Sequence, residues 1–308
     1  MVNKRKIIKT ILKILGVCLV VILGIISFFC LYEPHYNGLI KIPTQTLVFS
    51  HRGFGDYAPD NSLIAAETAI KNGLDGVDMD AQLTSDKEIV IFHDLSVDRL
   101  TTDTGRVSAK TLKEMESLDQ GIKFGKGFKD VFVKTFEDYV KNIANDGILM
   151  VELKVTGTEK TGIEERAAEI IKKYNAYDKV YLSSFNPIVL YRLKKIDPKI
   201  HTVFIFMDTN WNAELLKEIK PGDEVNLPWF LRNEFTRRLI RNIIKPDALS
   251  VNNEVDEHTI NTLIANGYPI FLWTVDSEDR IHWALDKKPY GIISNEPLLA
   301  KKLRDESK

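Results

Sequence analysis

The sequence predicts an α/β protein, namely a (β/α)8 TIM barrel preceded by an N-terminal transmembrane helix. Two observations predict this fold class. From residue 46 to residue 304, short apolar runs of strand length alternate with helical segments, which is typical of a parallel sheet. Residues 14–32 form an apolar stretch without a charged side chain. The 308 residues allow one large domain or two ordinary ones, and the alternation favours a single barrel.

The N-terminal stretch has the length and flanks of a membrane span. As a helix, its 19 residues cover roughly 28 Å, close to the ~30 Å of a bilayer core. Basic residues precede it and the first acidic residue, Glu33, follows it, which predicts a cytoplasmic N-terminus. We therefore expect a cytoplasmic basic tail (1–13), a transmembrane helix (14–32) and a linker (33–45). The protein is then a single-pass protein of the cell membrane, with its main domain (46–304) extracytoplasmic.

Two other interpretations of this stretch are weaker. A cleaved signal peptide would need a small-x-small site after the apolar run, and the sequence there, SFFCLYEPHY, is bulky. A buried core helix does not fit the flanking lysines. Both cysteines, Cys18 and Cys30, lie in this stretch, so the main domain can hold neither a disulfide nor a thiolate metal site. The net charge of −1 predicts no nucleic-acid partner.

The alternation predicts nine strands and nine helices. The expected strands are 46–50, 76–83, 88–94, 148–154, 179–185, 201–207, 247–251, 269–275 and 290–294. The expected helices are 61–72, 135–145, 162–174, 187–196, 212–219, 234–244, 256–266, 277–286 and 297–304. Nine strands exceed the eight positions of the barrel, so we expect one false strand or a non-barrel extension, within 76–94. Residues 95–133 break the alternation and are expected as an insertion over the barrel mouth.

Polar clusters follow three of these apolar runs. His51 and Arg52 end the first run, Asp78 and Asp80 lie in the second, and His93 ends the third. The carboxyl ends of barrel strands meet at one mouth, so we expect these side chains to converge. Two imidazoles can act as acid and base, carboxylates can hold a divalent cation, and an arginine can hold a phosphate.

The same block resembles the signature of the glycerophosphodiester phosphodiesterase family. The family pattern of HRG, P-E-N-T, E-x-D and H-D is met here by HRG (51–53), PDNS (59–62), DMD (78–80) and HD (93–94). Downstream, MVELK (150–154), SSF (183–185), FLWTV (271–275) and GIISNEP (291–297) are similar to later family elements. The resemblance covers residues 49–297. The departures are Asp60 and Asp78, each in place of Glu, Ser62 in place of Thr, and Asn295 in place of Asp.

The resemblance implies a phosphoric diester hydrolase that splits glycerophosphodiesters into glycerol 3-phosphate and an alcohol. Residues and resemblance together predict roles for nine side chains. The expected catalytic residues are His51 and His93, and the expected metal ligands are Asp78, Asp80 and Glu152. The expected substrate-binding residues are Arg52, Lys154 and Trp273, and Asp60 is expected as a partner of Arg52 or a further metal ligand.

Simpler structural roles compete with some of these assignments. Asp78 and Asp80 alternate along a strand and so share one side, where two carboxylates repel each other unless a cation or proton intervenes; the alternative is an exposed pair. Glu152 alternatively forms a plain ion pair with Lys154. Asp60 alternatively caps a helix, and Trp273 alternatively belongs to the core. An all-oxygen ligand set without thiols suits Mg²⁺ or Ca²⁺.

Two functional alternatives remain open at this stage. The same chemistry could act on lysophospholipids or on glycerophosphate polymers of the cell wall, which a membrane-anchored enzyme would meet. The shorter side chains of Asp60 and Asp78 could instead mark a degenerate barrel that binds glycerophosphate groups without turnover. The shorter Asp78 also predicts a weaker or more Ca²⁺-like metal site than in relatives with Glu.

Overall fold

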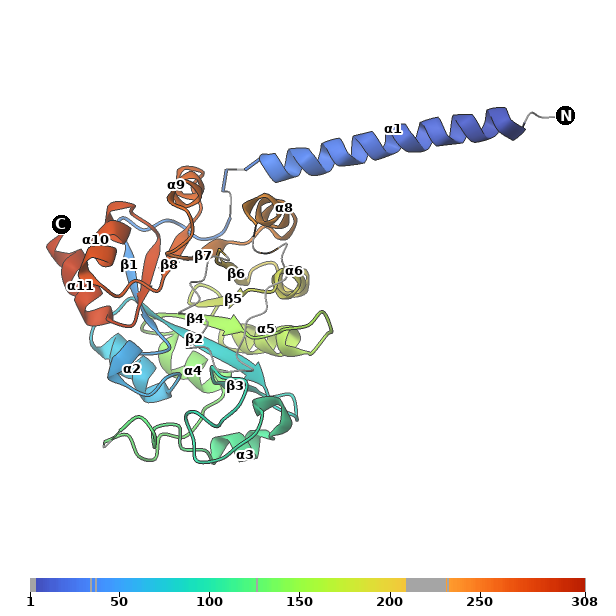
Figure 1. The fold of residues 1–308 in the computed structure, drawn as a ribbon. Coiled ribbons are helices and arrows are strands. Elements are labelled where there is room, and N and C mark those ends of the chain that lie inside the picture. Colours follow the sequence, from blue (N-terminus) through green and yellow to red (C-terminus); the bar gives the residue numbers. More distant parts are fainter. Residues whose placement is uncertain are drawn as a thin grey trace.

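The computed structural model describes residues 4–33, 35–36, 38–125, 127–208, 231 and 233–307, and its centre is a closed barrel of eight parallel strands (Figure 1). The barrel closes because the first strand pairs with both the last strand and the second. The predicted (β/α)8 fold is confirmed. The barrel strands are β1 (Leu47–His51), β2 (Gly76–Leu83), β4 (Ile148–Leu153), β5 (Val180–Ser184), β6 (His201–Phe206), β7 (Ala248–Asn252), β8 (Ile270–Trp273) and β9 (Gly291–Ser294).

The ninth predicted strand lies outside the barrel. Strand β3 (Ile89–Ile91) runs antiparallel to the end of β2, with Ile91 opposite Ala81. The expected extension within 76–94 is therefore confirmed. The side-chain amide nitrogen of Gln82 lies 2.7–3.1 Å from the carbonyl oxygens of residues 92–94. This contact fixes the backbone that carries His93 over the end of the barrel.

Helices surround the barrel and form its outer layer (Figure 1). They are α2 (Leu63–Lys71), α4 (Phe136–Ile143), α5 (Ile163–Tyr174), α6 (Pro187–Ile196), α8 (Glu234–Ile244), α9 (Glu257–Ala265), α10 (Glu278–Asp286) and α11 (Pro297–Glu306). The predicted helix at 212–219 lies outside the described residues. Helix α2 begins two residues later than predicted, because the Ser62 hydroxyl caps it by accepting a hydrogen bond from the Ala65 N–H.

The interior of the barrel is divided into an apolar floor and a polar mouth. The floor is a cluster of buried residues, namely Ile40, Phe49, Met150, Tyr181, Val203, Ala248, Phe271, Tyr290 and Ile293. Side chains two residues apart on a strand point to the same side. His51 therefore lies above Phe49 on the inner side of β1, and Glu152 lies above Met150 on β4. This alternation places the predicted site at the carboxyl ends of the strands.

The insertion 95–133 has a small core of its own beside β3, in the lower part of Figure 1. It contains the short helix α3 (Leu112–Glu116) and packs Val97, Val107 and Met115 against Phe92. Because the insertion is packed on the β2–β3 extension, it can bring side chains of its own to the mouth.

The N-terminal helix α1 (Lys4–Leu31) extends away from the barrel (Figure 1). Within the described residues, it is the one helix long and apolar enough to cross a membrane, and none of its apolar window is buried. The segment after α1 contacts the barrel domain. Ile40 is part of the barrel floor, and the backbone N–H of Tyr36 donates a hydrogen bond to the carbonyl of Asn266.

Candidate active site

Neighbouring strands bring the predicted residues of β1, β2 and β4 together. In the sheet register, His51 is paired with Asp78, and Asp80 is paired with Glu152. Because paired residues on adjacent strands point to the same side, these four side chains share the inner face at the barrel mouth. Lys154 lies directly beyond β4 and continues the same face. The structure thus gathers the predicted carboxylates in one place.

The ammonium group of Lys154 lies between two of these carboxylates. Its Nζ atom is 3.1 Å from Asp80 Oδ1 and 3.3 Å from Glu152 Oε2. Asn61 holds the other side of Asp80: its amide donates to Asp80 Oδ2 at 2.9 Å, and its Oδ1 accepts from the Asp80 N–H at 2.8 Å. The Glu152–Lys154 pair that we considered is present, but it is part of a larger cluster.

Burial and mutual repulsion set the pKa values of this cluster. Burial raises the pKa of Asp78 well above its usual range, and the charges of Asp80 and Glu152 add to the effect. Burial raises the pKa of Glu152 to about 7, with a further contribution from Asp80. Burial also disfavours the ionised form of Asp80, but the charges of Lys154, His93 and Arg52 and the Asn61 hydrogen bond together outweigh it and hold the pKa of Asp80 below its ordinary value. If all three carboxylates were ionised, they would carry more negative charge than Lys154 balances, and the raised pKa values of Asp78 and Glu152 reflect this.

The chemistry of this cluster suits a divalent cation, although its resting arrangement is not that of a formed metal site. Among the described residues, no group of three His, Cys, Asp or Glu side chains is arranged to hold a metal ion. Lys154 lies beside Asp80 and Glu152 instead. The raised pKa values of Asp78 and Glu152 reflect carboxylates that a cation would stabilise. Oxygen ligands of this kind fit Mg²⁺ or Ca²⁺.

His93 is held at both ring nitrogens. Its Nε2 is 2.8 Å from Arg52 Nη2, and its Nδ1 is 2.8 Å from Asp94 Oδ1. An arginine can only donate, so Nε2 accepts and Nδ1–H donates to the carboxylate. Burial and the positive charge of Lys154 lower the pKa of His93 to about 4. His93 is therefore neutral at pH 7, with its basic nitrogen turned to Arg52.

Arg99 closes a ring of charged groups around His93. It donates to both oxygens of Asp94, at 2.6 and 2.9 Å, and its Nη2 also lies 3.0 Å from Asp60 Oδ2. The same Asp60 oxygen lies 3.2 Å from Arg52 Nη1. Asp60 thus pairs with Arg52, as in one of its two predicted roles. The helix-cap alternative does not hold, because Ser62 caps α2.

His51 has a different support. Its Nδ1 is 2.7 Å from Asn295 Oδ1, and Asn295 Nδ2 donates to Asp276 Oδ2 at 3.0 Å. Because the Asn295 amide nitrogen is used for Asp276, its oxygen must accept, so His51 Nδ1 carries the proton. Burial and the charge of Arg52 lower the pKa of His51. The resembled motif has an aspartate at position 295. In this chain the Asn295 amide contacts His51 instead, and the Asp276 carboxylate in turn accepts a hydrogen bond from Asn295.

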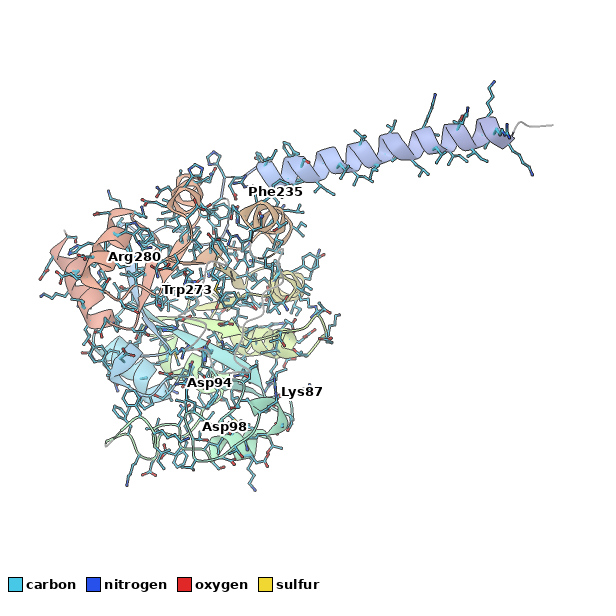
Figure 2. The ribbon with its side chains drawn as sticks, viewed as in Figure 1. Lys87, Asp94, Asp98, Phe235, Trp273 and Arg280 are labelled. Atoms are coloured by element: carbon cyan, nitrogen blue, oxygen red, sulfur yellow. The ribbon has the colours of Figure 1, made fainter. Side chains whose placement is uncertain are left out.

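Within the part of the chain that the structure describes, three buried polar atoms of the mouth have no hydrogen-bond partner, namely Arg52 Nε, Ser183 Oγ and Trp273 Nε1. Trp273 ends β8, and its ring meets Phe185 edge-on at 5.9 Å between centroids. Figure 2 labels Trp273 and Asp94 on their separate elements. Buried polar atoms are usually paired, so unpaired ones at a mouth are open to a polar ligand.

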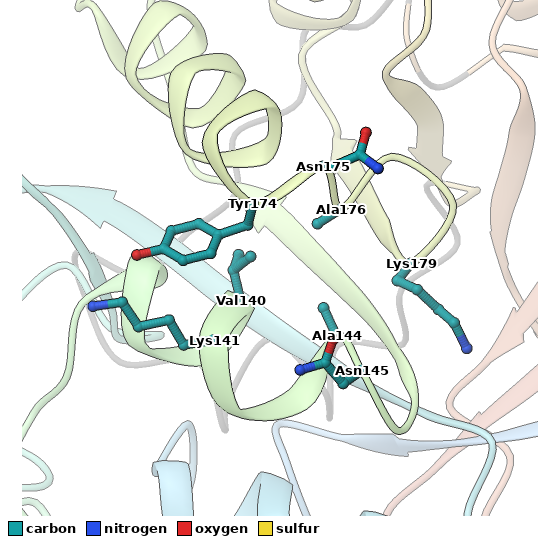
Figure 3. Close-up of a pocket in the computed structure, with 8 residues that line it drawn as sticks. All are labelled: Val140, Lys141, Ala144, Asn145, Tyr174, Asn175, Ala176 and Lys179. Atoms are coloured by element: carbon teal, nitrogen blue, oxygen red, sulfur yellow. The ribbon is translucent and has the colours of Figure 1, made fainter.

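A separate surface pocket of about 470 Å³ lies between the ends of α4 and α5 (Figure 3). Its lining includes Lys141, Tyr174, Asn175 and Lys179, and none of the nine predicted site residues. It contains no histidine and no carboxylate that could take part in acid–base chemistry. The barrel mouth is therefore the candidate active site.

Sequence analysis did not assign roles to Arg99, Asn61 or Asp276. Arg99 lies in the insertion, five residues after Asp94, and only the folded insertion brings it back to that carboxylate. Asn61 lies in the PDNS element, where an asparagine next to the motif aspartate was a usable signal. Asp276 directly follows FLWTV and had no partner visible in the sequence.

The lowered pKa of His93 predicts pH-dependent stability. Its folded-state pKa lies near 4, below the ordinary 6.5, so the unfolded chain takes up the proton first as the pH falls. We expect the free energy of unfolding to decrease between pH 6.5 and pH 4 by about 1–3 kcal/mol through this residue, at the lower end because 25% of the side chain is exposed. Urea unfolding across this range should show a smaller decrease for His93→Gln than for wild type. Equal slopes would contradict the prediction.

This chain is similar to known proteins over most of its length. Residues 51–299 match the model of the glycerophosphoryl diester phosphodiesterase family. The chain is 31% identical over 254 residues to a glycerophosphodiester phosphodiesterase of Caldanaerobacter subterraneus subsp. tengcongensis, covering 82% of this chain and 95% of that protein. It is 28% identical over 266 residues to a glycerophosphodiester phosphodiesterase of Bacillus altitudinis, covering 86% and 100%.

A solved structure shares the fold. A phosphodiesterase of Oleispira antarctica, in complex with the product sn-glycerol-3-phosphate, superposes with a TM-score of 0.68 at 22% identity, covering 85% of this chain and 97% of that one. The family match spans all nine predicted site residues, from His51 to Trp273. The predicted family resemblance is confirmed: the chain belongs to the glycerophosphoryl diester phosphodiesterase family and is a phosphoric diester hydrolase.

Proposed function

We propose that this enzyme hydrolyses glycerophosphodiesters to glycerol 3-phosphate and an alcohol by acid–base catalysis with His51 and His93, supported by a divalent cation. The observation that carries the proposal is that the two imidazoles are held in the same way. Each donates from Nδ1 to a fixed oxygen, which leaves Nε2 as its basic nitrogen. His51 is paired with Asp78 in the sheet, and the residue before His93 donates its backbone N–H to the Asp80 carbonyl, so both histidines lie near the carboxylate cluster.

The side chains divide the work as follows. One histidine takes the proton of the attacking hydroxyl, and the other gives a proton to the leaving alkoxide. Arg52 and Lys154 hold the phosphoryl oxygens, and the move of Arg52 toward the phosphate frees His93 Nε2 from its resting hydrogen bond. Asp94 and Arg99 keep the His93 ring oriented throughout. Trp273 lines the pocket for the glycerol moiety.

A divalent cation belongs to this proposal because the family generally uses one. Asp78, Asp80 and Glu152 would hold the cation, whereas Asp60 pairs with Arg52. When bound, it would supply positive charge that stabilises the phosphoryl oxygens in the transition state. The ion is Mg²⁺ or Ca²⁺, and the shorter Asp78 favours the longer Ca²⁺–oxygen bonds of about 2.3–2.6 Å.

Metal removal tests the proposal. With glycerophosphocholine as substrate, we expect EDTA to abolish activity of the full chain and Mg²⁺ or Ca²⁺ to restore it, because three ionised carboxylates would exceed the single positive charge of Lys154 that lies between them. Glycerol 3-phosphate release is measured across Mg²⁺, Ca²⁺ and Mn²⁺, with Asp78→Glu as the matched variant. Full activity in EDTA would contradict the cation requirement, and identical metal profiles would contradict the role given to the shorter Asp78.

Membrane position favours a second group of substrates for the same chemistry. The apolar helix α1 would keep the enzyme beside lysophospholipids and cell-wall glycerophosphate polymers. Turnover of these compounds relative to glycerophosphocholine distinguishes the alternatives. The binding-only alternative is set aside, because family membership and named relatives identify an enzyme.

We also propose that α1 anchors the protein and that the barrel lies outside the cytoplasmic membrane. Support comes from the length of α1 and from the basic residues at its N-terminal side. Protease added to intact cells is expected to remove the barrel domain. Complete protection, or a mature N-terminus located beyond residue 30, would contradict this topology.

A further inference from the structure

The end of the apolar helix is held by the wall of the barrel. Arg238 Nη1 donates to the Leu31 carbonyl at 3.0 Å. Asn242 Nδ2 lies 3.2 Å from the Phe29 carbonyl and 3.1 Å from the Tyr32 carbonyl. The last carbonyls of a helix have no partner within the helix. Here, two side chains of α8 supply those partners from more than 200 residues away.

An ion pair directly after the helix strengthens this attachment. The Glu33 carboxylate lies 2.9 Å from Arg238 Nε and 3.2 Å from Arg241 Nε. The side chains of Glu33 and Arg241 are 7% and 0% exposed. Arg237 and Arg241 in turn lie over the Phe206 ring of β6, at 4.6 and 5.9 Å. The contact that begins at α1 therefore continues into the barrel itself.

The outward side of α8 carries an apolar stripe next to this attachment. Phe235 and Ile243 are 44% and 59% exposed, and Leu239 between them is half-buried. Residues four apart lie on one face of a helix, so the three form a single stripe. Arg238 and Asn242, which hold α1, each lie one position before a member of the stripe. Figure 2 shows Phe235 beside the end of α1.

We propose that this stripe of Phe235, Leu239 and Ile243 rests on the lipid surface of the membrane that α1 spans. The inference depends on the proposed anchoring by α1. The charge-free span ends at residue 32, and α8 binds the carbonyls of residues 29, 31 and 32, so α8 lies within about one helical turn, ~5 Å, of the point where the chain leaves the hydrocarbon core. A helix in that position buries its apolar face at the lipid boundary.

Lipid explains the stripe better than a protein partner does. A single exposed apolar side chain is ordinary, but the exposed Phe235 and Ile243, with the half-buried Leu239 between them, share one face beside the unburied apolar helix α1, whose surface would contact lipid. Phe28, Phe29 and Tyr32 also gather at this end of α1, where aromatic side chains favour the headgroup region. The barrel is then seated on the bilayer rather than tethered by a loose linker.

Lipid quenching tests the docking directly. In the full chain, Cys18 and Cys30 are replaced by Ser, and Ile243→Cys is labelled with an environment-sensitive fluorophore. Ile64→Cys on α2 is the matched control, because Ile64 is also exposed, at 44%. The proteins are reconstituted into phosphatidylcholine–phosphatidylglycerol vesicles that contain a lipid with a nitroxide near the headgroup. We expect the label at 243 to be quenched at least threefold more than the label at 64.

The quenching and flotation results separate the docking of α8 from the anchoring by α1. Equal quenching at 243 and 64 in protein that floats with the vesicles would overturn the docking and leave the anchor intact. Protein that does not float with the vesicles would overturn both. Adding Arg238→Ala and Asn242→Ala should reduce quenching at 243 while the protein still floats, and unchanged quenching would show that these contacts do not seat α8. Hydrolysis of glycerophosphocholine, measured on the same samples, reports separately on the proposed reaction.

Discussion

Replacing His51 or His93 by glutamine is expected to lower kcat by two to four orders of magnitude, with a much smaller change in KM. Glutamine keeps a hydrogen-bonding side chain of similar length but cannot transfer a proton near neutral pH. A positioned acid or base contributes about 10²–10⁴-fold to a rate. In the proposed mechanism substrate binding depends mainly on Arg52, Lys154 and the cation, so it should survive both substitutions.

In the proposed mechanism the two histidines act in one proton-transfer cycle, so the effects of their substitution should not add. The double variant is expected to lose little more activity than the worse single variant. His282→Gln, an exposed residue on α10, is the matched control and should keep wild-type kcat. Steady-state kinetics on glycerophosphocholine compare these four variants with wild type. If either single variant kept kcat within tenfold of wild type, that histidine would not be the acid or base.

Removing the 2-hydroxyl of the glycerol moiety is expected to lower turnover by several orders of magnitude. Ser183 Oγ lies at the mouth, but among the described residues no base is hydrogen-bonded to it and could activate it. The nearest intramolecular nucleophile is the 2-hydroxyl of the substrate. An intramolecular attack gains an effective molarity of up to ~10⁵ M or more. A cyclic phosphate would form first, and water would open it after the histidines exchange roles.

Binding separates this effect from simple loss of recognition. The 2-deoxy and 2-methoxy analogues should still inhibit hydrolysis of glycerophosphocholine competitively, because they retain the phosphodiester that Arg52 and Lys154 hold. Single-turnover rates are compared for the analogues and the parent compound. A deoxy analogue turned over as fast as glycerophosphocholine would mean direct attack by water, and the proposed exchange of roles would have to be abandoned.

The fold was largely predictable because barrel strands can be recognised from local sequence patterns. Each apolar run is short and is followed by a helical segment. The excess ninth run corresponds to β3, which pairs with the end of β2 outside the barrel. Exact ends were less predictable. The start of α2 depends on the Ser62 cap and on the left-handed backbone of Asn61, with φ of 56°, and propensity alone does not locate either.

The convergence of the candidate residues was predictable, but their contacts were not. Strand-end positions and motif spacing identified His51, Asp80 and Glu152, because parallel strands bring their carboxyl ends together. That Lys154 lies between two carboxylates, rather than apart from them, follows from distances that no spacing contains. The hydrogen bonds of Arg99 to Asp94 arise from the folded insertion, which has no regular periodicity to interpret.

The most direct test of the account follows glycerophosphocholine by phosphorus NMR with wild type, His51→Gln and His93→Gln, at equal protein and metal concentrations. The account predicts that wild type converts the diester signal into that of glycerol 3-phosphate, whereas both variants leave the diester unchanged over the same time. Absence of glycerol 3-phosphate with wild type, or equal conversion by either variant, would contradict the assignment of acid–base catalysis to the two histidines at the barrel mouth.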